Sequence, residues 1–92
     1  MLCLAQHNSK IYIRGYVLNK AQQAIDMANI FETIQLEGVT TNEKGYYEIA
    51  LQKADSFNIT FSCIGYKSVE KKISTDKESF TLNITLQEDI TE

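Results

Sequence analysis

The chain has 92 residues, enough for one small domain, and its formal net charge is −3. This acidic balance argues against a nucleic-acid-binding protein, which usually carries a basic patch and a high isoelectric point. Hydrophobic residues make up 43% of the sequence, as in globular domains, but no apolar run approaches the roughly 18 residues of a membrane-spanning helix.

The first six residues resemble the end of a secretory signal. Small residues at Cys3 and Ala5 precede Gln6, as they do before a signal cleavage site. The apolar segment is shorter than a complete signal core, so an ordinary apolar N-terminus is the alternative. Cys3 also lacks the preceding apolar stretch that a lipid-attachment cysteine requires. We therefore predict a signal remnant at residues 1–6.

From residue 10 onward, apolar residues mostly alternate with polar ones. Successive side chains of a strand point to opposite faces, so each alternating run predicts a strand with one buried and one wet face. One wet face per strand is typical of antiparallel sheets. Val69 and Ile73 flank three consecutive charged residues and predict a further strand at a sheet edge. The four strongest runs are 11–18, 46–51, 57–63 and 80–87.

The run 57–63 has the densest set of alternating apolar residues. It predicts a central core strand that ends in Cys63, which we expect to be a buried, unreactive thiol. Gly65 is expected to bend the chain sharply, because one strand ends before it and the next is expected to begin at Tyr66.

The expected turns fall between these strands. Residues 42–45 have the composition of a β-turn, in which Gly45 can adopt a positive φ. Residues 53–56 and 74–78 separate the later strands. The chain has no proline, so it must turn with glycine, asparagine, aspartate and serine.

Residues 20–36 are ambiguous at the level of local sequence. Helical spacing of apolar residues favours a helix over 20–31; these residues are Ala21, Ala24, Ile25 and Ala28. A strand over 29–36 is the alternative, with Ile30, Ile34 and Leu36 on one face and Glu32 interrupting it. Glu32 is expected to be either a satisfied edge residue or part of a polar site.

Few residues are available for catalysis or metal binding. The single histidine, His7, is close to the N-terminus, where a general base is hard to hold in position. Together with Cys3 and Cys63 it supplies at most three ligands from distant points, whereas a structural zinc site needs four. No pair of glycines has the spacing of a phosphate-binding loop, and the acidic residues are spread along the chain. We therefore expect no catalytic residue, no metal and no cofactor.

Four motifs follow one another along the chain: Ile11-x-Ile13-x-Gly15-x-Val17, Ala24-Ile25 with Ala28-Asn29-Ile30, Gly38 to Tyr47, and Phe61-Ser62-Cys63-Ile64-Gly65-Tyr66. In this order they resemble the carboxypeptidase regulatory-like domain, which stands at the N-terminus of many TonB-dependent outer-membrane receptors, especially those of Bacteroidetes. The motif residues are Gly15, Gly38, Gly45, Tyr47, Ser62, Gly65 and Tyr66. Three departures from the family pattern are Ala24 in place of proline, Asn42 in place of aspartate, and Glu32 in place of an apolar residue.

The resemblance implies an all-β fold, a transthyretin-like (prealbumin-like) antiparallel β-sandwich of about seven strands. It favours the strand alternative in the ambiguous segment, with a loop over 20–27 and a strand over 28–36. The sandwich domain is expected over 7–87 and the start of a linker over 88–92.

The resemblance also implies a function. It implies a non-catalytic accessory or interaction domain in the periplasm, tethered to the outer membrane through the parent protein and monomeric when isolated. Its expected partner is the plug or barrel of its own receptor, or a periplasmic protein. One alternative is a β-sandwich spacer in another exported or surface protein. A remote alternative is a transthyretin-related hydrolase or carrier, an enzyme type that uses several histidines.

Overall fold

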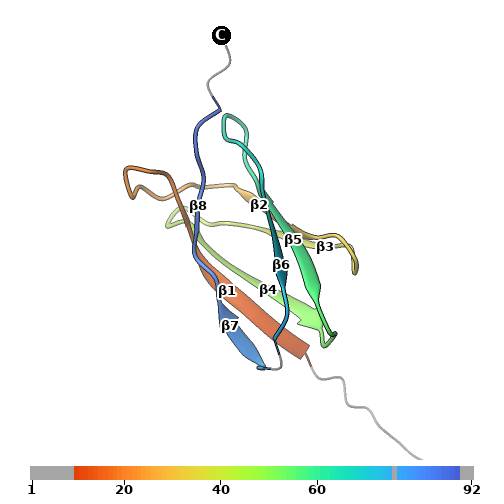
Figure 1. Cartoon of the computed structure of the whole chain (residues 1–92). Coiled ribbons are helices and arrows are strands. Elements are labelled where there is room, and N and C mark those ends of the chain that lie inside the picture. Colours follow the sequence, from red (N-terminus) through yellow and green to blue (C-terminus); the bar gives the residue numbers. More distant parts are fainter. Residues whose placement is uncertain (1–9, 76, 90–92) are drawn as a thin grey trace, which may run out of the picture.

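The computed structural model describes residues 10–75 and 77–89, which form eight β-strands and no helix (Figure 1). The predicted signal remnant, His7 and Cys3 lie outside the described residues. The strands are β1 (Lys10–Leu18), β2 (Asn29–Glu32), β3 (Glu37–Thr40), β4 (Tyr46–Gln52), β5 (Phe57–Ser62), β6 (Val69–Ile73), β7 (Ser79–Thr81) and β8 (Ile84–Thr85).

The eight strands form two sheets, which confirms the predicted all-β sandwich. One sheet has the order β4-β1-β7, with β8 also paired to β1, and the other has the order β3-β2-β5-β6. Most pairs are antiparallel, as predicted, but β7 and β8 run parallel to β1. The predicted strand 80–87 is divided at Leu82 and Asn83, where the Leu82 amide and the Asn83 side chain form hydrogen bonds with β1. This division accounts for eight strands instead of about seven.

The core lies between the two sheets and follows the predicted alternation. In β1, β4 and β5 every second side chain is buried, and β5 lies between β2 and β6, as expected for a central strand. The rings of Tyr47 and Phe61 meet edge to face across the core, with centroids 5.6 Å apart. The largest fully buried side chains include Tyr47, Phe57, Phe61, Ile11, Ile13, Ile30, Ile49, Leu51, Ile59 and Leu86.

Residues 20–27 form a loop, as the resemblance implied, and not the helix that local spacing favoured. The Asn19 side chain accepts hydrogen bonds from the amides of Ala21 and Gln23, each 2.9 Å long, and Gln22 has a φ of 66°. These features are typical of a turn and are incompatible with a continuing helix. The amide of Ile25 then donates to the Val17 carbonyl, so the loop is fixed to β1 and Ile25 enters the core.

The strand predicted over 28–36 is shorter than expected. It ends at Glu32, residues 33–36 form a turn, and Leu36 has a φ of 60°. The prediction that Ile34 and Leu36 share a buried face with Ile30 is wrong, because both project into solvent.

The Glu32 carboxylate explains this turn. It is fully buried and accepts the backbone amides of Gln35 at 2.6 Å and Asn58 at 2.8 Å. The Gln35 side chain donates to the carbonyl of Gln52, and the Gln52 amide donates back to it, both at 2.9 Å. Glu32 is therefore a satisfied residue that ties the turn to β5, and Gln35 ties the same turn to β4.

Glu32→Ala is expected to destabilise the protein by about 2–4 kcal/mol, because it leaves two backbone amides without a partner in a buried place. Glu37→Ala is the matched control, since Glu37 is the cross-strand partner of Glu32 but is exposed. Its expected effect is within about 0.5 kcal/mol. Urea denaturation of both variants measures the difference, and equal effects would contradict the bonding role of Glu32.

Candidate interaction surface

The motif residue Gly15 lies where the chain between β7 and β8 crosses closest to β1. A Cβ on Gly15 would overlap the carbonyl oxygen of Leu82. The Leu82 amide donates to the Arg14 carbonyl at 2.8 Å, and the Asn83 side chain accepts the Tyr16 amide at 2.9 Å. Gly15 is therefore needed for close backbone approach.

Tyr47 completes this contact. Its hydroxyl donates a hydrogen bond of 2.6 Å to the Leu82 carbonyl, while its ring is buried in the core. Gly15 and Tyr47 are directly opposite each other in the β1–β4 pair, so the structure brings these two motif residues together.

Because the phenol of Tyr47 is buried, we expect the free energy of unfolding to change at alkaline pH. Burial raises its pKa above the usual value of 10.0, so the unfolded chain ionises first as the pH rises. The unfolded state then binds fewer protons than the folded state, and the free energy of unfolding falls above about pH 10. Tyr47→Phe is expected to lose about 1 kcal/mol at neutral pH and to show a shallower alkaline decline. Urea denaturation between pH 8 and 11 tests this, and parallel declines would contradict it.

The two motif glycines near the next turn have different roles. Gly45 has a φ of 78° in the predicted turn, where the Asn42 side chain accepts the amides of Lys44 and Tyr46. Gly38 lies in β3 and not in a turn. Its position faces Phe31, whose ring would be 3.1 Å from an added Cβ.

The last motif forms the loop between β5 and β6. Ser62 ends β5 half-buried. Cys63 is also half-buried and packs against the core, so its predicted burial is met only in part. Tyr66 does not begin β6, which starts at Val69; it forms an isolated bridge with Glu88 instead. Further bonds join this loop to the C-terminal segment, namely Lys67 amide to Gln87 carbonyl at 2.8 Å and Asp89 amide to Gly65 carbonyl at 2.9 Å.

Gly65 has a φ of 90°, which supports the predicted sharp bend, although an added Cβ would meet nothing within 4 Å. Gly65→Ala is therefore expected to cost about 1–2 kcal/mol through backbone strain alone. Gly65→Asn should cost less, because asparagine tolerates left-handed backbone better. Thermal and urea denaturation compare the two, and a neutral alanine variant would show that the loop does not need this conformation.

The described residues hold no group of three or more His, Cys, Asp or Glu side chains placed to bind a metal.

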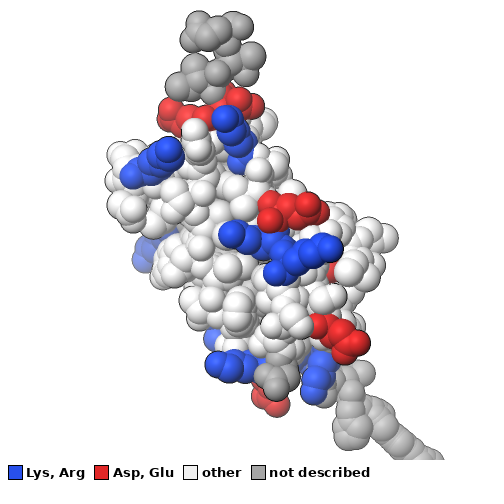
Figure 2. Space-filling view, viewed as in Figure 1, with Lys and Arg blue, Asp and Glu red and all other residues white. Residues whose placement is uncertain are grey.

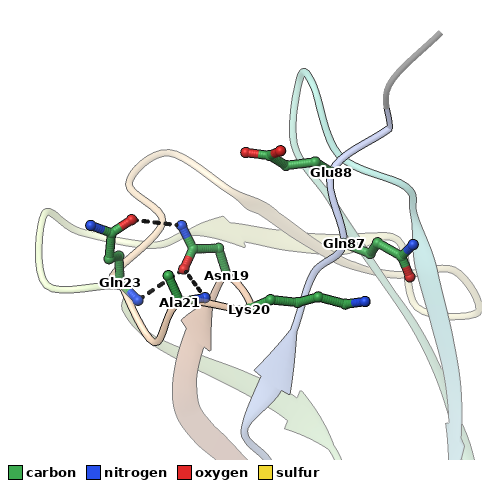
Figure 3. A pocket seen from close by; sticks show the side chains of 6 residues that line it. All are labelled: Asn19, Lys20, Ala21, Gln23, Gln87 and Glu88. Atoms are coloured by element: carbon green, nitrogen blue, oxygen red, sulfur yellow. Dashed lines mark hydrogen bonds between the residues drawn. The ribbon is translucent and has the colours of Figure 1, made fainter.

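A pocket of about 380 Å³ lies between the loop after β1 and the segment after β8 (Figure 3). Asn19 and Gln23 are bonded to each other there, and Lys20 extends toward Gln87 (Figure 3). The lining side chains other than Asn19 are exposed, and the polar atoms of the half-buried Asn19 are already used within the loop.

Charged side chains do not form a single-sign patch on the face drawn in Figure 2, where lysine and arginine are interspersed with acidic residues. Arg14 and Glu48 form an exposed ion pair of 2.7 Å on the outer face of β1 and β4, and this hydrogen bond raises the pKa of Arg14. Exposed pairs of this kind contribute little to stability or recognition.

No helix within the described ranges is long and apolar enough to span a membrane.

The most unusual surface is the β2–β3 hairpin. Three of the seven exposed large hydrophobic side chains in the described residues lie on it: Phe31 is 41% exposed, Ile34 66% and Leu36 72%. Figure 1 shows the turn between β2 and β3 projecting to the right of the sandwich. The bonds made by Glu32 and Gln35 fix the turn that presents these side chains. Sequence reasoning missed this surface because it placed Ile34 and Leu36 in a strand.

A groove of about 580 Å³ extends from this hairpin across the outer face of β2, β3 and β5. Phe31 and Gly38 lie in it as cross-strand partners, and the motif residue Ser62 is at its far side. We call the groove, together with Phe31, Ile34 and Leu36, the hairpin surface. Its lining residues are Asn29, Ile30, Phe31, Gly38, Val39, Thr40 and Ser62.

The family model described as CarboxypepD_reg-like domain matches residues 13–92. No curated protein matches the chain. The family match covers all four motifs except the first two positions of the opening strand motif, and it includes the hairpin surface.

Proposed function

The chain belongs to the CarboxypepD_reg-like domain family, and from this premise we propose that it is a periplasmic interaction domain of a TonB-dependent outer-membrane receptor. The family is that of a regulatory-like module, and the resemblance of the sequence motifs to receptor extensions supports the receptor setting. In this role the domain does no chemistry; it binds the receptor's own plug or a periplasmic protein.

The hairpin surface carries this proposal. A small sandwich usually buries its large aliphatic side chains, and exposed clusters of them mark interaction sites. Here Ile34 and Leu36 are exposed on a turn that is tied to both sheets, so the exposure is built into the fold and is not a frayed end. Leu36 keeps a left-handed φ of 60°, a conformation that costs energy for leucine and that the surrounding bonds must maintain.

The test compares nutrient binding and nutrient uptake by cells that carry the full receptor or a receptor without residues 10–89, at matched receptor levels. The periplasmic domain hangs on the opposite side of the membrane from nutrient capture. We therefore expect surface binding to remain and uptake or its regulation to fall. Loss of surface binding with a correctly assembled barrel would contradict the proposal.

A second arm of this experiment separates interaction from spacing. The domain is replaced by an unrelated β-sandwich of similar length. An interaction domain predicts that uptake stays low in this replacement. Full recovery of uptake would favour the spacer alternative.

A further inference from the structure

Four main-chain polar groups of β3 face away from the rest of their sheet. The Thr41 amide donates to the Ala28 carbonyl, and the next pairs along the hairpin are Thr40 with Asn29, then Val39 with Ile30. Hydrogen-bonded and non-bonded pairs alternate in an antiparallel ladder. The amide and carbonyl groups of Gly38 and Thr40 therefore point outward, and both residues are exposed.

The other sheet edges are less available for pairing. On β4, Asn42 bonds both main-chain groups of Tyr46 and Gln35 bonds both groups of Gln52, so both ends of this edge are occupied and only the groups of Glu48 and Ala50 between them are left outward. β6 carries three consecutive charged residues, 70–72, which guard an edge against pairing. β7 and β8 have three and two residues and are interrupted between them.

After Glu37, the β3 edge has small, uncharged side chains and a groove beside it. Gly38 has no side chain, and the half-exposed ring of Phe31 lies against the place that one would occupy, in the groove of the outer face. A strand added along β3 would place a side chain opposite Gly38, on the same face as Phe31, where an apolar group packs against this ring. Glu37, at the start of β3, is the single exposed charge of residues 29–41 and favours a basic residue opposite it.

We infer that β3 is a docking edge for an extended segment of a partner protein, which adds a fifth strand to the sheet. The segment carries an apolar side chain opposite Gly38 and a lysine or arginine opposite Glu37, and the partner surface around it covers Ile34 and Leu36. A second copy of this chain fits less well, because its own β3 has Glu37 and no lysine or arginine to place opposite Glu37. This inference rests on the proposed interaction role and names the chemistry of the partner.

The test uses the 92-residue chain and a defined probe. The probe is a seven-residue capped peptide of alternating valine and threonine with a lysine at each end, and the control peptide is the same sequence N-methylated at every backbone amide. Amide hydrogen exchange is followed by NMR. At about 90% occupancy, exchange of the Gly38 and Thr40 amides is expected to slow about tenfold, because only the free edge exchanges. The methylated peptide should have no effect.

Domain variants locate the site. Thr40→Pro removes an outward amide without breaking a β2–β3 bond and should abolish binding. Lys72→Pro is the matched control, because the β5–β6 register also turns the Lys72 amide outward, and it should bind normally. If Thr40→Pro does not fold, Phe31→Ser replaces it and is expected to weaken binding at least severalfold.

Three results would overturn the inference. The first is protection of amides at β4 or β6 equal to that at β3, and the second is unchanged peptide binding by the Thr40→Pro or Phe31→Ser variant. The third is self-association of the free chain that Thr40→Pro abolishes, which would assign the edge to a second copy. The receptor deletion is a separate experiment. Loss of uptake in the deletion without peptide binding at β3 would contradict this inference alone, and peptide binding with normal uptake would contradict the proposed function.

Discussion

Gly15→Ala is expected to destabilise the protein by about 3–5 kcal/mol. The added Cβ would overlap the Leu82 carbonyl oxygen, and a backbone atom cannot rotate aside as a flexible side chain can. Forced overpacking alone costs about 1–3 kcal/mol. Moving residues 82–83 away also weakens three hydrogen bonds, each contributing about 1 kcal/mol: Tyr47 hydroxyl to Leu82, Leu82 amide to Arg14, and Tyr16 amide to Asn83.

Gly38→Ala is the matched control for this prediction. Its added Cβ would come to 3.1 Å from a ring carbon of Phe31, a half-exposed side chain that can shift. We expect this variant to lose less than about 1 kcal/mol. Urea denaturation gives both free energies. Equal losses at the two positions would show that the approach of Leu82 to β1 does not depend on Gly15.

Phe61→Ala is expected to cost about 3–5 kcal/mol, because it deletes a fully buried ring from the central strand β5. Phe61 also packs edge to face on Tyr47, a geometry that adds about 0.5–1.5 kcal/mol beyond burial. The cavity would lie between the two sheets, where neither β2 nor β6 can move in without losing its own pairing with β5.

Phe31→Ala is the control for the core prediction, since Phe31 lies on the adjacent strand but is 41% exposed. Its expected loss is about 1 kcal/mol. Equilibrium denaturation of both variants measures the difference. A loss below about 1 kcal/mol for Phe61→Ala would place this ring outside the core and contradict the register of β5.

Much of the sandwich could be predicted because its strands are amphipathic. In β1, β4 and β5, burial follows the period of two in the sequence, and Gly45 adopts the positive φ that its turn position predicted. The motif resemblance resolved the ambiguity at 20–27, where local spacing favoured a helix. Local spacing failed there because the Asn19 side chain and the bonds to β1 stabilise a loop.

The hairpin surface could not be predicted from local sequence, because it depends on contacts between distant residues. The exposure of Ile34 and Leu36 follows from a turn that Asn58 and Gln52 help to fix, and these residues are 17 or more positions away from their partners. The parallel pairing of β7 with β1 is also a tertiary feature, since alternation gives a strand's faces but not its direction. One local signal was present: Glu32 stood out between apolar positions, and its carboxylate is what holds this turn.

We propose above that the domain is part of a receptor, and the central claim of that proposal is that the hairpin surface is what the domain contributes. The most direct measurement is uptake by the full receptor carrying Ile34→Ser and Leu36→Ser, compared with the Ile64→Ser control, in which the 99% exposed Ile64 on a different loop is changed. At matched receptor levels, we predict that the hairpin variant reproduces the uptake defect of the domain deletion, with surface nutrient binding and domain folding intact. The Ile64 control should behave as the unmodified receptor. Normal uptake by the hairpin variant, alongside a defect in the deletion, would contradict the claim.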